Sequence, residues 1–123
     1  AVDYLTAIGM HNVRQHEREI TAYALETLTN RFGDDIVIHG SRDINQRGAT
    51  LSFAYRDVHP HDVSQVLDQH NVCVRAGHHC AKPLMRLLGA NATVRASFYL
   101  YNTNAEVDAL ADALAEAGDF FTL

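Results

Sequence analysis

Apolar residues repeat along the chain with two periods, one of about 3.6 residues that is typical of helices and one of two residues that is typical of strands. The helical period predicts five segments, at 2–8, 12–32, 60–71, 83–88 and after Asn102. Strand patterns occur at 36–38, 48–55, 72–75 and 93–98. This mixed order predicts an α/β fold, a two-layer small domain in which about four strands are covered by helices. It leaves the order of the strands within the sheet open.

The apolar faces of these segments define the expected core. Gly9 is expected to end the first helix, Asn12 to cap the second, and Glu106 to complement the dipole at the start of the last. Cys73 lies between two valines and is expected to be a buried, inert thiol. The core residues expected on the helices are Val13, Ile20, Ala24, Leu28, Phe32, Val63, Val66, Leu67, Val107, Leu110, Ala111 and Leu114.

Composition and charge are those of an ordinary globular domain and exclude several partners. Hydrophobic residues make up 47% and charged residues 20% of the 123 residues, which is enough for one domain with a core. The formal net charge of −5 argues against nucleic acid and anionic membranes as partners. No apolar run is long enough for a membrane-spanning helix. The two cysteines have dissimilar surroundings and suggest no disulfide framework, so a cytoplasmic location is expected.

The chain is expected to be part of a longer protein. It opens on Ala1 rather than methionine, inside a segment with helical spacing, and Lys82 is its only lysine. The alternative is a small complete protein from which the initiator methionine has been removed.

The densest chemistry lies in the segment Arg75-Ala76-Gly77-His78-His79-Cys80-Ala81-Lys82-Pro83. A thiol acts as a nucleophile only as the thiolate, and neighbouring cations favour that form. Arg75 is permanently charged, whereas His78 and His79 can exchange a proton near neutral pH. Cys80 is therefore predicted to be a reactive nucleophile.

The backbone of the same segment supports this interpretation. Gly77 permits a tight turn, and Pro83 suits the first turn of a helix whose N-terminus also favours an anion near Cys80. The competing interpretation is that a lone cysteine is a small buried hydrophobe, as expected for Cys73. The polar, cationic neighbours of Cys80 favour the reactive role.

Arg95 is the second candidate site residue, because it interrupts an apolar strand at 93–98. Its structural interpretation is that it reaches the surface or pairs with a carboxylate. Its functional interpretation is a planar fork that grips a substrate carboxylate through two hydrogen bonds. Arg75 and Arg95 lie on strands that flank the cysteine segment, so they could converge on one small anionic ligand.

No metal site is expected. Adjacent histidines such as His78 and His79 seldom bind one metal ion together, and the common zinc-ligand spacings are missing. His59 and His61 flank Pro60 at a helix start and are expected to be solvated or capping residues. The sequence also lacks a glycine-rich phosphate loop.

Two segments resemble a known family. Arg75-Ala76-Gly77-His78-His79-Cys80-Ala81-Lys82-Pro83-Leu84-Met85 resembles the active-site cysteine motif of the group II cysteine desulfurases, the SufS and selenocysteine lyase-like branch. The strand Val94-Arg95-Ala96-Ser97-Phe98-Tyr99-Leu100-Tyr101-Asn102-Thr103 is similar to the substrate-arginine segment of that family, and Glu106-Val107-Asp108 to the start of its last helix. The resemblance extends through nearly all of the chain.

The resemblance implies a pyridoxal-phosphate enzyme of fold type I, of which residues 1–123 are the C-terminal small domain. A large domain of the same protein then carries the lysine that binds the cofactor, because Lys82 lies in a different motif. This chain alone is expected to be inactive. The implied complete enzyme is a homodimer that passes sulfur to an acceptor protein, for iron–sulfur cluster assembly.

The implied reaction converts L-cysteine to L-alanine and leaves the sulfur on Cys80 as a persulfide. The resemblance assigns the substrate carboxylate to Arg95, and gives Arg75 and His79 the role of tuning the thiolate or positioning the sulfur. His78 and Gly77 are supporting residues of the motif.

Three alternatives remain at the level of sequence. One is a selenocysteine lyase, with L-selenocysteine as the substrate of the same thiol. The second is a sulfur-carrier or redox module that uses Cys80 without pyridoxal phosphate. The third is a purely structural or regulatory domain in which Cys80 is inert.

Overall fold

Two interior strands form the centre of the fold. β2 (Thr50–Tyr55) pairs antiparallel with β4 (Thr93–Ser97), and short edge strands flank them: β1 (Ile36–Ile38) beside β2, and β3 (Arg75–Gly77) beside β4. The strand order is therefore β1-β2-β4-β3, antiparallel throughout. The structure, a computed structural model, describes residues 1–122.

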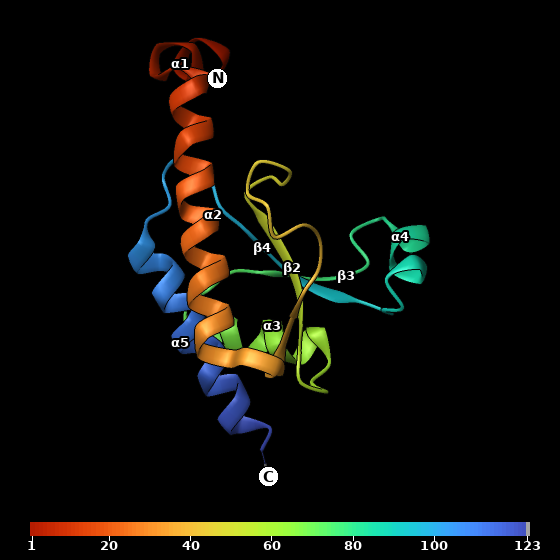
Figure 1. Cartoon of the computed structure of the whole chain (residues 1–123). Coiled ribbons are helices and arrows are strands. Elements are labelled where there is room, and N and C mark those ends of the chain that lie inside the picture. Colours follow the sequence, from red (N-terminus) through yellow and green to blue (C-terminus); the bar gives the residue numbers. More distant parts are fainter. Residues whose placement is uncertain (123) are drawn as a thin grey trace.

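Three helices pack against one face of this sheet. They are α2 (Met10–Phe32), α3 (Pro60–Gln69) and α5 (Asn104–Phe120); α5 contacts both other helices, and α2 and α3 contact strands (Figure 1). The short α1 (Val2–Ile8) precedes α2 and lies at the N-terminal end of the molecule. A single 3-10 turn, Gly33–Asp35, connects α2 to β1. The α4 helix (Lys82–Leu87) stands apart from the other helices, beyond β3 (Figure 1).

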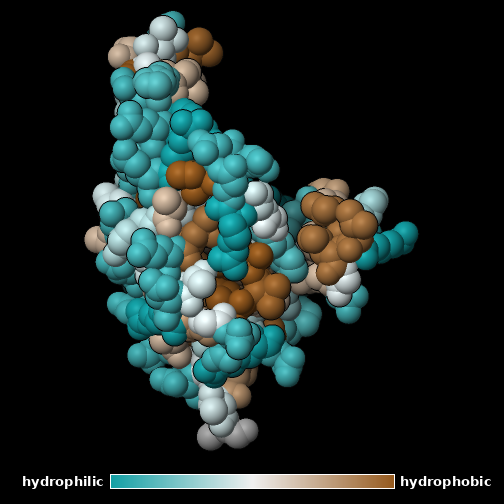
Figure 2. Space-filling view, in the orientation of Figure 1, coloured by the Kyte–Doolittle hydropathy of each residue, from teal (hydrophilic) through white to brown (hydrophobic). Residues whose placement is uncertain are grey.

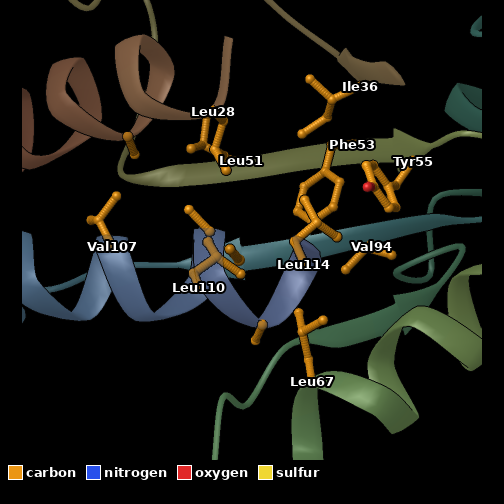
Figure 3. Close-up of a cluster of buried hydrophobic side chains, with 14 of the residues drawn as sticks. Leu28, Ile36, Leu51, Phe53, Tyr55, Leu67, Val94, Val107, Leu110 and Leu114 are labelled. Carbon is orange, nitrogen blue, oxygen red and sulfur yellow. The ribbon is translucent and has the colours of Figure 1, made fainter. Parts of the chain in front are cut away.

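The core lies between the sheet and the three helices. Leu51, Phe53 and Val94 point from the strands toward Leu67 of α3 and Leu114 of α5 (Figure 3). All five side chains are fully buried. The two-layer α/β architecture with four strands, predicted from the sequence, is confirmed.

The helix predictions are correct except at some boundaries. Asn12 was predicted to cap the second helix, but α2 already begins at Met10, and the Asn12 side chain donates instead to the Ile8 carbonyl oxygen at 2.8 Å. Glu106 lies in the first turn of α5, as predicted, and its carboxylate accepts hydrogen bonds from Asn102 and from the Thr103 backbone, both at 2.9 Å. These bonds lower the pKa of Glu106.

The strand prediction at 72–75 is wrong. Strand pairing begins only at Arg75, and the residues before it run past β4 without pairing to it. Cys73 is consequently exposed, whereas its two valine neighbours are only half-buried. The apolar triplet was mistaken for a core strand because local composition does not reveal where an edge strand separates from the sheet.

The helices of residues 1–122 do not include a membrane span. The longest of them, α2, has 23 residues, but no helix in this range carries the long apolar run that crossing a bilayer requires.

We expect Leu67→Ala to lower the free energy of unfolding by about 2–5 kcal/mol, because the side chain is fully buried and its removal leaves a cavity in the core. Leu87→Ala is the matched control, since Leu87 is 84% exposed. Urea denaturation followed by circular dichroism measures both variants. Equal unfolding midpoints for the two variants would show that Leu67 is not part of the core.

Candidate active site

The pleat of β4 separates the core from the candidate site. Val94 and Ala96 face the helices and are buried, so the alternating residues Thr93 and Arg95 point to the opposite face of the sheet. The residues that pair with Arg95 on the two neighbouring strands lie on this same face. Ser52 of β2 lies opposite Arg95 on one side, and Arg75 of β3 lies opposite it on the other.

The cross-strand pair Arg75 and Arg95 places two cations at facing positions. Like charges directly opposite each other on antiparallel strands destabilise a sheet. The ion pairs within residues 1–122 are Arg14–Glu17, Arg31–Asp112 and Arg56–Asp35, so none of them neutralises this pair. The Arg95 Nε atom is also buried, without a hydrogen-bond partner in the described part of the chain. The arrangement is suited to an anion that contacts both guanidinium groups.

The charged residues near the two arginines in the sequence all have one sign. Between Asp68 and Glu106 the sequence has four cationic residues and no acidic one, although the whole chain carries a net charge of −5. The cations in this stretch are Arg75, Lys82, Arg86 and Arg95. A local positive field of this kind attracts small anions.

The thiol of Cys80 is carried by a strained turn. His79 and Cys80 have backbone φ angles of 53° and 58°, in the left-handed region that non-glycine residues rarely occupy. Two consecutive positive φ angles are the signature of a type I′ turn, and the Ala81 amide closes this turn by donating to the His78 carbonyl oxygen at 2.8 Å. Left-handed geometry costs about 1–2 kcal/mol for each residue with a Cβ atom. The surrounding contacts therefore have to hold the turn.

The His79 imidazole provides one such contact. Its Nε2 atom lies 2.9 Å from the hydroxyl oxygen of Thr93, a fully buried residue of β4. Burial is the main cause that lowers the pKa of His79, followed by the positive charges of Arg95 and, more weakly, Arg75. A hydrogen bond to the Thr93 backbone raises the pKa, but less than burial and the Arg95 charge lower it. The net effect is to lower the pKa of His79 and so to favour its neutral form.

Several of the predicted site residues meet at one open cavity of about 380 Å³. Cys80 is exposed there. The residues predicted from the sequence that line it are Arg75, Gly77, His78, His79 and Cys80. Arg95 does not line this cavity, although its cross-strand partner Arg75 does.

The cavity also contains residues that the sequence did not assign to the site. His59 and His61 were expected to be solvated or capping residues, and the His59 ring does accept a hydrogen bond from the His61 amide at 3.2 Å. Both histidines nevertheless line the cavity of Cys80. Thr93 was expected only as a strand residue. It does not line the cavity but contacts His79, which does. No local pattern could have identified these three residues, because the fold brings them to the cysteine segment from the start of α3 and from β4.

A larger hollow, of about 510 Å³, lies elsewhere, near the end of α5. Its arginine, Arg56, is already neutralised by Asp35 at 2.9 Å and donates to Gly118 and Thr122. No cysteine lines it. The chemistry therefore favours the cavity of Cys80 as the candidate site.

The α4 helix presents apolar side chains beside the thiol. Leu84 and Leu87 are 49% and 84% exposed, and the space-filling view shows an apolar patch at α4 (Figure 2). Met85 is the buried residue of α4. α4 begins two residues after Cys80, so the patch follows the cysteine turn closely along the chain.

Comparison with known proteins identifies one protein family over most of the chain. Residues 1–110 match the family model described as aminotransferase class-V. A probable cysteine desulfurase of Streptomyces coelicolor is 49% identical over 121 residues, which are 98% of this chain and 28% of that protein. A probable cysteine desulfurase of Halalkalibacterium halodurans is 46% identical over 121 residues, 98% of this chain and 29% of that protein. The chain thus spans under a third of the length of these relatives.

Solved structures show the same fold. A cysteine desulfurase from Thermococcus onnurineus NA1 superposes with a TM-score of 0.88 at 34% identity, over 96% of this chain and 29% of that one. The cysteine desulfurase CsdA (S-sulfonic acid) from Escherichia coli superposes with a TM-score of 0.85 at 30% identity, over 96% of this chain and 28% of that one.

We expect a maleimide reagent to label both cysteines of the native chain, because both are exposed. Mass spectrometry counts the labels, and Cys73→Ser and Cys80→Ser should each leave one. If the native wild-type chain took up one label, kept that label in Cys73→Ser, and took up a second label only in denaturant, Cys73 would be buried as its apolar neighbours suggested.

Proposed function

The chain belongs to the aminotransferase class-V family, and we propose that it is the C-terminal small domain of a pyridoxal-phosphate-dependent cysteine desulfurase. The similarity to probable cysteine desulfurases over 98% of the chain supports this function. The limited share of those relatives that the chain covers, 28% and 29%, supports its assignment to one domain of a longer protein. The cysteine motif at 75–85 supports the group II branch of the family.

One observation carries the proposal: an exposed thiol and a guanidinium group share a cavity, and a second guanidinium group lies on the adjoining strand. Cys80 and Arg75 line the cavity, and Arg95 faces Arg75 across the sheet. A nucleophile for the sulfur atom and a receptor for the carboxylate are the two functions that desulfuration of an amino acid requires.

In the proposed reaction the Cys80 thiolate attacks the sulfur atom of L-cysteine. A bond forms between the two sulfur atoms, and the bond between the substrate sulfur and its carbon breaks. The electron pair of the broken bond remains with the carbon skeleton, which takes up a proton and leaves as L-alanine. Cys80 retains the sulfur as a persulfide.

The positively charged groups orient the substrate in this proposal. The guanidinium of Arg95 binds the substrate carboxylate through two parallel hydrogen bonds, a geometry that lysine cannot reproduce. Arg75 adds positive charge at the cavity where the sulfur is transferred. His79 and His78 support the cysteine turn from within the same cavity.

The residues of this chain do not fit a complete pyridoxal-phosphate site. Its only lysine, Lys82, is exposed at the first residue of α4. We therefore assign the cofactor and its lysine to the remaining part of the longer protein, and expect this chain alone to be inactive. There the cofactor supplies the electron sink for the carbon skeleton.

The exposure of Cys80 supports transfer of the persulfide sulfur to another protein. The thiol lies at an open cavity rather than in a closed one, and the exposed apolar residues Leu84 and Leu87 follow it on α4. An acceptor protein in iron–sulfur cluster assembly is the proposed recipient, and the complete enzyme is proposed to be a homodimer.

We expect Cys80→Ala to abolish the formation of L-alanine from L-cysteine by the full-length protein that contains this chain, because the variant lacks the sulfur nucleophile. The assay contains pyridoxal phosphate and a thiol reductant, which removes the persulfide. Cys73→Ala is the matched control and should retain wild-type activity, since Cys73 lies outside the cavity.

Activity retained by Cys80→Ala would remove Cys80 from the reaction. A wild-type protein that produces no alanine from L-cysteine or from L-selenocysteine would contradict the proposed function as a whole.

We expect Arg95→Ala to raise KM for L-cysteine about 10-fold or more, because a charge-assisted hydrogen bond contributes about 1.5–3 kcal/mol. Arg95→Lys keeps the charge but loses the planar fork, and should raise KM by an intermediate factor. Steady-state kinetics of the full-length protein measures both, with Arg18→Ala on the exposed surface of α2 as the control. Unchanged KM and kcat in Arg95→Ala would refute the carboxylate assignment.

A further inference from the structure

The turn that carries Cys80 cannot rely on glycine for its left-handed geometry. The two central positions of the turn are occupied by His79 and Cys80, both with positive φ angles. The nearest glycine, Gly77, lies outside the turn and has its own positive φ angle of 132°. A turn of this kind persists only when contacts from the surrounding structure fix it.

Two hydrogen bonds hold this turn in the described part of the chain. The backbone bond between Ala81 and His78 closes the turn but does not connect it to the sheet. The contact between the His79 imidazole and the Thr93 hydroxyl does connect it, because Thr93 is a fully buried residue of β4. Thr93 is also the cross-strand partner of Gly77, the last residue of β3 before the cysteine turn. The Thr93 hydroxyl therefore connects the cysteine turn to the sheet beside Gly77, where β3 ends.

The contact with Thr93 is the side-chain hydrogen bond that the structure gives the His79 ring within residues 1–122. The Nδ1 atom of His79 is buried and has no hydrogen-bond partner in this range. The Nε2 atom and the Thr93 hydroxyl can form one hydrogen bond in either neutral tautomer of the ring, with Nε2 as the donor or as the acceptor. Burial and the positive charges of Arg95 and Arg75 disfavour a second proton on the ring.

We propose that Thr93 is a positioning residue for the desulfurase reaction: its hydroxyl holds His79, and His79 fixes the left-handed turn that keeps the Cys80 thiol at the cavity lined by Arg75. This inference rests on the proposed function for its kinetic consequence. Its structural part, that Thr93 restrains His79, stands independently of any activity. Thr93 itself touches neither the thiol nor the substrate in this proposal.

Thr93→Val tests the role of the hydroxyl, because valine has nearly the same shape but cannot accept a hydrogen bond. In the full-length protein with pyridoxal phosphate bound, we expect kcat for L-cysteine to fall at least about 10-fold while KM changes less than about twofold, since a misplaced nucleophile slows the chemical step. Thr93→Ser restores the hydroxyl and should recover most of kcat.

The matched control is Thr21→Val. Thr21 is another buried threonine, on α2, and its hydroxyl has no hydrogen-bond partner in the described residues. Its replacement repeats the chemical change far from the turn and should leave kcat and KM unchanged. Equal losses in Thr93→Val and Thr21→Val, or equal losses in Thr93→Val and Thr93→Ser, would overturn the proposal.

A double variant tests whether Thr93 acts through His79. His79→Ala removes the same contact from the turn, so Thr93→Val combined with His79→Ala should be no slower than His79→Ala alone. Fully additive losses would overturn the proposal. Should Thr93→Val fail to fold, His79→Ala must by itself show the loss of kcat at nearly constant KM, and a wild-type kcat in that variant would overturn it.

Labelling of His79 separates this inference from the proposed function. Diethyl pyrocarbonate reacts with free imidazole nitrogens, and peptide mass spectrometry follows His79 against the exposed His61 in the same molecule. We expect at least threefold faster labelling of His79 in Thr93→Val, and the wild-type rate in Thr93→Ser. Faster labelling of His79 in Thr93→Val, found in a protein without desulfurase activity, would refute the proposed function but support the restraint of His79 by Thr93. An unchanged labelling rate of His79 in Thr93→Val would overturn the inference.

Discussion

The register of β4 is the constraint on which the rest of the structure depends. Val94 and Ala96 are held in the core by the helices, with 0% and 4% of their surface exposed. The strand period of two then forces Thr93 and Arg95 to the other face. A slip of one residue would bring the Arg95 guanidinium into an apolar core and remove Val94 from it, both at high cost. Packing on one side of the strand thus determines where the chemistry lies on the other.

The same register places two positive charges at facing positions, an arrangement that lowers stability and that a purely structural domain does not need. Arg75 and Arg95 face each other across two strands, within a stretch of sequence that has no acidic residue from 69 to 105. Repulsion between them weakens the edge pairing of β3, which is only three residues long. An anion between the guanidinium groups removes this repulsion, so the charge pattern favours a site that is completed by its ligand. This argument supports the proposed carboxylate role of Arg95 independently of any similarity to other proteins.

The sequence predicted those parts of the molecule that local periodicity determines. The apolar stripes of α2, α3 and α5 and the alternation in β2 and β4 lead directly to the two-layer fold, and the short range between Arg75 and Cys80 keeps the motif together at one cavity. Cys73 shows where such reasoning fails, because an apolar triplet looks the same whether or not it pairs with a neighbouring strand. His59 and His61 reach the cavity from the start of α3, and Thr93 reaches His79 from β4, and only the tertiary fold makes these contacts visible.

The left-handed turn at Cys80 explains why the site needs support from outside its own motif. Glycine would adopt the observed φ angle of Cys80 without strain, but glycine has no thiol, so the position cannot be relieved by substitution. The strain has to be balanced by neighbours, and α4, with six residues and little contact to the other helices, offers weak support on one side. The other side is tied to β4 through His79 and Thr93. The strand that fixes the arginine therefore also restrains the thiol, so that the two groups of the proposed reaction share one rigid element as their common reference.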